Sequence, residues 1–374
     1  MRRYLFIDRD GTLIEEPPDT QQVDSCERLR LLPYVISTLR WAQKVGGYRL
    51  VMITNQDGLG TPSFPEKNFW SVQNLLIDIF SSEGVSWYAI HIDRSKESAP
   101  SPYRKPSPLF LLPYIESGID RERSFVIGDR RTDMLLAQRI GLRGLWLPNP
   151  LHQRDPSLPN AVLVKDWRDI QFFLRSRLFF IEVERQTKET HIHLQMTLYG
   201  SGAVEVQTGI GFFDHMLTLL AFHAGWDFRL RAVGDLHVDV HHTIEDVAIV
   251  IGEALRRLLS DKRGLHRYGQ AIQEQLLLPM DEALAFVAVD LSGRGLIKWN
   301  ASFSEAPGNI SPTLWRHFFE TLAREAGITL HIWVRGKEAH HMIEAVFKGV
   351  GRALKAALQR EEEDLILPST KGAL

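Results

Sequence analysis

Two short segments of the chain repeat the same arrangement of two histidines and a glutamate. Residues 241–246 read HHTIED, and residues 340–345 read HHMIEA. On a helix, the first histidine and the glutamate four residues later lie on one face, whereas the adjacent histidine points about 100° away. One such helical turn can therefore offer ligands to two different metal ions.

A further histidine precedes each repeat, His215 in GFFDHM and His317 in RHFFE. A single His-His-x-x-Glu segment is more often a solvated helix face or a set of core histidines. Two copies, each preceded by a further histidine at a similar distance, favour a metal centre. Nitrogen and oxygen ligands without a thiolate favour Mn, Fe, Co or Zn over a structural thiolate zinc site. The candidate ligands are six imidazoles and two carboxylates: His215, His241, His242, Glu245, His317, His340, His341 and Glu344.

A second set of reactive side chains follows apolar runs near the N-terminus. Asp8 and Asp10 follow the first run, Thr54 follows a second, and Asp129 follows a later one. An isolated Asp-x-Asp is usually a solvated turn, but a pocket that collects these aspartates would repel itself without a cation. Ligands that are all oxygen favour Mg²⁺, and Lys105 could supply an opposite charge.

The spacing of apolar residues predicts the elements that must position both sets. In the first part of the chain, short apolar runs alternate with helical patterns, which predicts an α/β domain with a parallel sheet and a site beyond the carboxyl ends of its strands. The expected strands are 4–7, 50–53, 89–92, 125–127 and 145–147, and the expected helices are 68–80, 109–115 and 166–174. A proline-rich stretch from 148 to 159 then predicts a boundary. The predicted domains are 1–165 and 178–374, joined by a linker at 166–177.

The later part of the chain predicts an α+β domain made of two duplicated, β-rich halves with two helices each. In the first half we expect strands at 191–198 and 203–208, a helix at 216–222, another strand pair and a helix at 243–259. In the second half we expect strands at 285–291 and 296–303, a helix at 314–325, a strand at 330–335 and a helix at 340–359. The two His-His-x-x-Glu copies carry this inference of duplication.

The first domain resembles the haloacid dehalogenase superfamily of aspartate-based phosphatases, through DRDGTL at 8–13, Thr54, Lys105 and GDRRTD at 128–133. The resemblance implies that Asp8 attacks phosphorus and that Asp10 protonates the leaving alkoxide and then activates water. It also implies Mg²⁺ held by Asp8, the carbonyl of Asp10 and Asp129, with phosphoryl oxygens bound by Thr54 and Lys105. The stretch TNQDGLGTPSFP at 54–65 is similar to the histidinol-phosphatase branch.

One loop departs from that branch, which commonly carries three cysteines and a histidine that bind zinc. Here residues 91–106 read HIDRSKESAPSPYRKP without a cysteine, and His91 alone cannot hold zinc. We therefore expect no zinc in this loop. The departure leaves a second interpretation open, in which the first domain is an inactive or differently specific module attached to another enzyme.

The second domain closely resembles imidazoleglycerol-phosphate dehydratase, through TGIGFFDHM at 208–216, GDLHVDVHHTIED at 234–246 and HHMIEAVFK at 340–348. The resemblance implies two Mn²⁺ per site, each held by three His and one Glu from the candidate ligands, and Glu189 as the proton-transfer carboxylate. The metals would stabilise the imidazolate of the substrate while its neighbouring hydroxyl leaves. The implied phosphate-binding residues are Arg267, Arg294, Lys348, Ser369, Thr370 and Lys371.

Taken whole, the chain resembles the bifunctional histidine-biosynthesis proteins that join this dehydratase to histidinol-phosphatase. Two reactions are then expected: dehydration of imidazoleglycerol phosphate to imidazole-acetol phosphate, and hydrolysis of histidinol phosphate to histidinol and phosphate. The family assembles its dehydratase sites between subunits of large homo-oligomers, and we expect the same here. A metal-buffering protein that only uses the histidine clusters is a third interpretation.

Composition narrows the possible partners of the 374-residue chain. A formal net charge of −2 offers no general attraction to nucleic acid or to an anionic membrane. Cys26 is the only cysteine, which excludes an internal disulfide and fits a reducing compartment. No apolar stretch approaches the ~20 residues that span a bilayer, and the N-terminus is wrong for a signal peptide. We therefore expect a cytoplasmic enzyme that acts on small phosphate esters.

Overall fold

The computed structural model describes residues 1–155, 157–260, 262–270, 277–361 and 365–371. The chain divides into two compact units, Met1–Leu178 and Phe179–Leu374. Most of the segment expected to be a linker, 166–177, lies within helix α5 (Trp167–Leu178). This helix belongs to the first unit, because Trp167, Ile170 and Leu174 are part of its hydrophobic core. Within the described ranges, no helix combines the length and the apolar character needed to cross a membrane.

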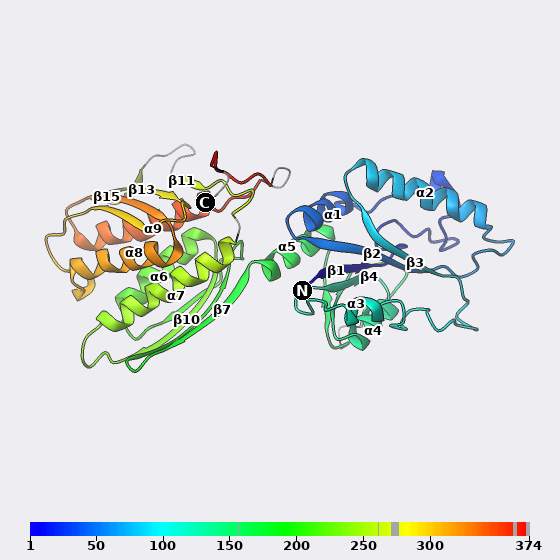
Figure 1. The fold of residues 1–374 in the computed structure, drawn as a ribbon, viewed down its shortest axis with the longest axis horizontal. Coiled ribbons are helices and arrows are strands. Elements are labelled where there is room, and N and C mark those ends of the chain that lie inside the picture. Colours follow the sequence, from blue (N-terminus) through cyan, green and yellow to red (C-terminus); the bar gives the residue numbers. More distant parts are fainter. Residues whose placement is uncertain (156, 261, 271–276, 362–364, 372–374) are drawn as a thin grey trace. The chain divides into compact units, whose positions relative to one another are not determined.

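The first unit contains a six-stranded parallel sheet with the order β3-β2-β1-β4-β5-β6 (Figure 1). Its strands are β1 (Arg3–Ile7), β2 (Tyr48–Asn55), β3 (Trp87–Asp93), β4 (Phe125–Gly128), β5 (Arg143–Trp146) and β6 (Ala161–Leu163). Its helices are η1 (Cys26–Arg28), α1 (Val35–Lys44), α2 (Glu66–Ser82), α3 (Leu112–Glu116), α4 (Arg131–Arg139) and α5. The predicted parallel α/β architecture is confirmed, although β6, α1 and α4 were not among the expected elements.

Side chains of the central strand β1 alternate between two cores, because successive residues of a strand point to opposite faces. Leu5 and Ile7 join the core that α1, α2 and α5 cover, whereas Tyr4 and Phe6 join the core on the side of α3 and α4. Figure 1 shows α1 and α2 on one side of the sheet and α3 and α4 on the other. With both faces covered, polar groups gather beyond the carboxyl ends of the strands.

The second unit has two sheets with a layer of four helices between them (Figure 1). The first half provides β7 (Phe180–Gln186), β8 (Thr190–Thr197), β9 (Val204–Gln207), α6 (Gly211–Ala224), β10 (Asp227–Gly234) and α7 (His241–Leu259). The second half provides β11 (Tyr268–Gln270), β12 (Leu278–Met280), β13 (Ala283–Asp290), β14 (Leu296–Asn300), η2 (Pro307–Asn309), α8 (Pro312–Ala326), β15 (Thr329–Arg335) and α9 (Ala339–Ala357).

The topology of the two sheets confirms the predicted duplication. One sheet has the order β7-β8-β10-β9, and the other has β11-β13-β15-β14, with β12 also paired to β13. In each sheet the two central strands are antiparallel, and the strand before the first helix of that half pairs in parallel with one of them. The helices cross between halves, since α6 packs on α9 and α7 packs on α8.

One expected element is wrong. A strand pair was expected between the helix around 216–222 and the helix around 243–259, but between α6 and α7 the structure has the single strand β10. The backbone turns directly after it, because Val238 N donates to the Asp235 carbonyl at 2.8 Å and His241 N donates to Asp239 Oδ1 at 2.7 Å. These turn contacts start α7 at His241, so the histidine pair opens the helix.

Candidate active sites

The reactive residues of the first unit meet at the carboxyl ends of three adjacent strands. Asp8 follows β1, Thr54 lies near the end of β2, and Asp129 follows β4. Because β1 lies between β2 and β4, these three ends are neighbours at one edge of the sheet. A cavity of about 520 Å³ opens there and is lined by Asp8, Asp10, Thr54 and Lys105, among other polar residues.

Three buried carboxylates form the floor of this site. Oxygens of Asp8, Asp129 and Asp133 all lie within 4.8 Å of one another. Burial raises the pKa of Asp8 and that of Asp129 to about 6, and it also raises the pKa of Asp133. Lys105 Nζ lies 2.7 Å from Asp8 Oδ1 and 2.7 Å from Asp133 Oδ1. The Arg130 guanidinium also lowers the pKa of Asp8 and Asp129, but two cations beside three carboxylates still leave a net negative site, which suits a divalent cation.

Asp10 lies apart from this cluster and is held by two donors. Arg9 Nη1 donates to its Oδ1 at 2.8 Å, and Gln56 Nε2 donates to its Oδ2 at 2.5 Å. Gln56 also donates to Thr54 Oγ1 at 2.8 Å, so it connects two residues expected to act on the phosphate ester. Sequence reasoning missed Gln56, although it lies within the 54–65 segment that resembles histidinol-phosphatase.

Asp129 has further partners that the sequence did not indicate. Asn149 Nδ2 donates to Asp129 Oδ2 at 2.6 Å and to Glu16 Oε2 at 3.0 Å. Glu16 also accepts from Arg130, and its Oε2 lies 3.2 Å from His152 Nε2. Glu16 lies more than a hundred positions before the residues that it contacts, so no local pattern could have grouped them.

Hydrogen bonds hold the loop at residues 91–106, where the related branch carries cysteines. The Asp93 carboxylate accepts from the hydroxyls of Ser95 and Ser101, and Arg104 bridges Asp57 Oδ1 at 2.5 Å and the Ser95 carbonyl at 2.7 Å. His91 is engaged elsewhere, because its Nε2 lies 2.8 Å from the Tyr114 hydroxyl. These hydrogen bonds order the loop at the place where the related branch carries its zinc ligands.

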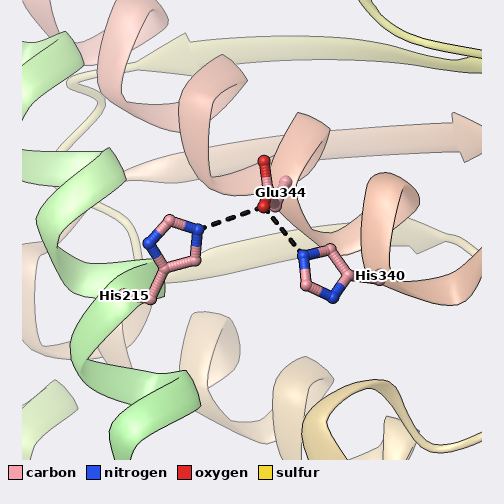
Figure 2. Close-up of side chains that lie close together, drawn as sticks. All are labelled: His215, His340 and Glu344. Carbon is pink, nitrogen blue, oxygen red and sulfur yellow. Dashed lines mark hydrogen bonds and ion pairs between the residues drawn. The ribbon is translucent and has the colours of Figure 1, made fainter.

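In the second unit, two clusters of candidate metal ligands form where helices of opposite halves cross. Figure 2 shows the first, in which His215 of α6 and His340 of α9 both point their Nε2 atoms at Glu344. The distances from Glu344 Oε1 are 3.1 Å to His215 and 2.9 Å to His340. Burial alone would raise the pKa of Glu344, but hydrogen bonds from Lys348, His215 and His340 lower it to about 2. The carboxylate is therefore ionised and ready to bind a cation.

The second cluster repeats this arrangement on the other helix pair. His241 and Glu245 of α7 meet His317 of α8, with their ligand atoms within 4.8 Å of one another. His317 Nε2 lies 3.4 Å from Glu245 Oε1, yet it is buried and has no hydrogen-bond partner among the described residues. A buried imidazole nitrogen beside a carboxylate, without a donor to satisfy it, fits a metal ligand.

His242 and His341, the second histidines of the two pairs, do not join either cluster. His242 Nδ1 lies 3.3 Å from Asp235 and 3.7 Å from Glu189 Oε2, and His341 Nδ1 lies 2.7 Å from Glu282 Oε2. These carboxylates raise the pKa of both imidazoles, chiefly through Asp235 and Glu282. Within the described part of one chain, each cluster thus has two histidines and one glutamate, one histidine fewer than expected.

The expected phosphate-binding residues fall into separate groups. Arg267 donates to Asp290 at 2.7 Å and to the Pro368 carbonyl at 2.7 Å, which brings the segment with Ser369, Thr370 and Lys371 next to it. Arg294 is exposed in the turn after β13. Lys348 is instead beside the first cluster, with Nζ 2.7 Å from Glu344 Oε2.

Comparison with known proteins matches both units. Residues 208–354 match the family model described as imidazoleglycerol-phosphate dehydratase, and residues 102–163 match the one described as HAD-hydrolase-like. The histidine biosynthesis bifunctional protein HisB of Spirosoma linguale is 45% identical over 388 residues, covering 100% of both chains. The protein of the same name from Bacteroides fragilis is 43% identical over 378 residues, again with 100% of both chains covered. A crystal structure of the dehydratase from Pyrococcus furiosus is 38% identical, covers 51% of this chain and 100% of its own, and gives a TM-score of 0.44.

Fold, clusters and comparisons together define an enzyme with two activities, a haloacid-dehalogenase-like phosphatase domain followed by an imidazoleglycerol-phosphate dehydratase domain. The chain belongs to the family of HisB bifunctional histidine-biosynthesis proteins. Full-length relatives with this name favour two activities over a dehydratase that carries an inactive module. Both component families use divalent metals, and the three groups of candidate ligands described above are of the matching types.

Proposed function

We propose that the second unit converts imidazoleglycerol phosphate to imidazole-acetol phosphate with two Mn²⁺, and that the first hydrolyses histidinol phosphate with Mg²⁺. The observation that carries the dehydratase is the pair of His₂Glu clusters formed by crossing helices. The observation that carries the phosphatase is Asp8, with Lys105, Asp129 and Asp133 around it at the strand ends.

Two features support metal binding at these places. In the second unit, His317 Nε2 is buried beside Glu245 without a hydrogen-bond partner among the described residues. In the first unit, three buried carboxylates lie together, and Lys105 pairs with two of them, Asp8 and Asp133. Nitrogen with oxygen donors suits Mn²⁺, and oxygen donors alone suit Mg²⁺.

In the phosphatase, Asp8 is the nucleophile. Its carboxylate oxygen attacks phosphorus, and the bond between phosphorus and the alcohol oxygen breaks while Asp10 gives that oxygen a proton. Asp10 then takes a proton from water, which attacks the phospho-aspartate and releases inorganic phosphate with Asp8 restored. Thr54 and Lys105 donate to the phosphoryl oxygens, and Arg9 and Gln56 hold Asp10 in place between the two steps.

In the dehydratase, bound metal ions supply Lewis acidity to the imidazole ring of the substrate. Glu189 accepts the proton that leaves carbon and returns it to the departing hydroxyl, which leaves as water, and the resulting enol becomes the ketone. The Glu189 carboxylate is half exposed and lies 3.7 Å from His242 Nδ1, which leaves it accessible to substrate beside a predicted ligand. Arg267, Arg294, Lys348 and residues 369–371 are the proposed phosphate donors, through guanidinium, ammonium and hydroxyl groups.

We further propose that the dehydratase site is completed by another copy of the chain. Each cluster of the described chain lacks a third histidine, while His242 and His341 lie outside both. Supply of both His242 and His341 from neighbouring copies would complete the two ligand sets and would require a homo-oligomer. A cytoplasmic location stays a prediction.

Reciprocal variants test both functions in one protein. We expect Asp8→Asn to lower phosphate release from histidinol phosphate about 10⁴-fold or more while dehydration is unchanged. We expect Glu189→Gln to lower imidazole-acetol phosphate formation by about 10²- to 10⁴-fold with metal content and phosphatase activity unchanged. In each variant, the unchanged activity of the other unit controls for the amount of intact protein in the assay. Wild-type protein that binds Mn²⁺ but forms no ketone would point to metal buffering, and absence of phosphate release by wild type would contradict the phosphatase.

A further inference from the structure

The internal duplication of the second unit allows its acidic residues to be compared position by position. Strand β8 begins at Thr190 directly after Glu189, and β13 begins at Ala283 directly after Glu282. Thr190 pairs with Gly234, and the register of β13 with β15 places Gly336 opposite Ala283. A Cβ on Gly234 would meet Thr190, and a Cβ on Gly336 would meet Ala283. Glu189 and Glu282 are therefore equivalent positions of the two halves.

The two equivalent glutamates contact their histidines differently. Glu282 Oε2 lies 2.7 Å from His341 Nδ1, which is a hydrogen bond, whereas Glu189 Oε2 lies 3.7 Å from His242 Nδ1. In the first half the closer carboxylate is Asp235, at 3.3 Å from His242 Nδ1.

The position equivalent to Asp235 is Lys337, since each follows one of the paired glycines. The second half therefore has no carboxylate at that position and uses Glu282 instead.

The contact with Glu282 determines which nitrogen of His341 can bind a metal. An ionised carboxylate only accepts hydrogen bonds, so Nδ1 must carry the proton, and the lone pair of the neutral ring is then on Nε2. His215, His340, His241 and His317 all turn Nε2 toward a glutamate of their clusters, so Nε2 is the common candidate ligand atom. His341 Nε2 has the exposed Asp281 carboxylate at 3.5 Å.

Glu282 is itself fixed, which a positioning role requires. Its Oε1 accepts from the backbone N–H groups of Lys337, at 3.2 Å, and Glu338, at 2.8 Å, just before α9 begins. Oε2 is left for the imidazole. Partners of metal-bound histidines that orient the ring in this way commonly contribute about 10- to 100-fold in metal affinity.

We propose that Glu282 is a positioning residue that holds the Nδ1–H tautomer of His341 and presents Nε2 to a divalent ion. In the second half, Glu282 orients the histidine. In the first half, Asp235 orients His242. Glu189 is therefore not needed for this contact and is available for proton transfer with the substrate. This inference rests on the proposed dehydratase function.

The test is Mn²⁺ affinity of the full-length protein, measured by titration alongside steady-state kinetics. We expect Glu282→Gln to weaken Mn²⁺ binding at one of the two predicted sites about 10- to 100-fold, with kcat restored near wild type at saturating Mn²⁺. The glutamine retains an acceptor oxygen for the two backbone N–H groups, so the start of α9 is preserved. Asp235→Asn should also weaken Mn²⁺ binding and keep kcat at saturating Mn²⁺. Glu189→Gln should instead lower kcat without a change in Mn²⁺ affinity.

Glu338→Gln is the matched control, because the Glu338 charge also raises the pKa of His341, whereas the hydrogen bond to Nδ1 comes from Glu282. Metal affinity of Glu282→Gln equal to wild type, or a loss no larger than that of Glu338→Gln, would overturn the proposal. A loss of kcat at full metal occupancy would also overturn it, since Glu282 would then act on the substrate. Wild-type protein that binds no Mn²⁺ would instead refute the proposed function itself.

Discussion

At the scale of single residues, burial decides the charge state of the phosphatase site. Asp8 and Asp129 are almost completely buried, and burial raises the pKa of each to about 6 from 3.8. Lys105 lowers the pKa of Asp8, but it cannot balance three carboxylates. Without a cation, protonation of Asp8 or Asp129 reduces the electrostatic repulsion among the three carboxylates at the lowest cost in free energy.

This predicts an unusual pH dependence of stability for the metal-free protein. The folded state keeps protons on Asp8 and Asp129 between about pH 4 and pH 6, where the unfolded state has lost them. The free energy of unfolding of the first unit should therefore fall as the pH rises through this window, by on the order of 1–3 kcal/mol, and then level off. Pulse proteolysis in urea with EDTA measures it. Asp129→Asn should flatten the dependence, as should Mg²⁺, and a stability that rises from pH 4 to 6 would contradict the prediction.

A second prediction concerns Gln56, which bridges Thr54 and Asp10. Gln56→Ala removes a charge-assisted hydrogen bond from Asp10, so we expect kcat for phosphate release to fall about 10-fold with little change in KM. Gln73 is a matched control, because it is also buried in the first unit but donates to Met52 Sδ. Equal effects of Gln56→Ala and Gln73→Ala on kcat would show that only packing is affected.

At the scale of elements, two equivalent glycines set the crossing of the helices that carry the histidines. Gly252 of α7 and Gly351 of α9 each follow the first histidine of their helix by the same interval. A Cβ on Gly252 would lie 2.5 Å from Glu325 Cβ of α8, and one on Gly351 would lie 2.5 Å from the Leu220 carbonyl of α6. Close approach at these points brings His317 to α7 and His215 to α9.

We therefore expect Gly252→Ala and Gly351→Ala to force the helix pairs apart despite the better helix propensity of alanine. The thermal midpoint of the second unit should fall by about 2–10 °C, and metal content should fall with it. Gly211→Ala in α6 is the control, since a Cβ there would meet nothing within 4 Å. Calorimetry with metal analysis measures both effects, and a Gly351→Ala protein as stable as Gly211→Ala would refute the role of this contact.

At the scale of the whole molecule, we expect the dehydratase activity to require several copies of the chain and the phosphatase activity to require one. The phosphatase residues all come from Met1–Leu178. The dehydratase clusters of one chain each have two histidines and one glutamate, with His242 and His341 outside both. Sharing of dehydratase sites between copies follows as an expectation, while each phosphatase site is expected to work alone.

Complementation between inactive variants tests this sharing. His215→Ala removes a cluster ligand, and His242→Ala removes a histidine that we expect to reach another copy. Each variant alone should lack dehydratase activity, but co-expression should restore about a quarter of the sites through random pairing of intact surfaces. Phosphatase activity should stay at the wild-type level in every sample. No restoration in mixed oligomers would place all ligands within one chain.

Local pattern was enough to predict many features of this protein. Asp8, Thr54 and Asp129 were identified because parallel strands end at one edge, where reactive residues gather. The repeated His-His-x-x-Glu turns indicated helices, because residues four apart lie on one face of a helix. Their repetition indicated a duplication, and their residue types indicated the ligands. The family was also recognisable from these motifs, and the comparisons support it.

Tertiary structure alone decided which residues meet. His215 and Glu344 are separated by 129 positions and come together only because α6 packs on α9 across the two halves. The same holds for Glu282 with His341 and for Asn149 with Glu16, whose contacts depend on loop paths and on the crossing of packed elements. Side-chain types and periodicity follow from the sequence by itself, whereas partners follow from packing, because hydrophobic burial brings together elements that no local pattern connects.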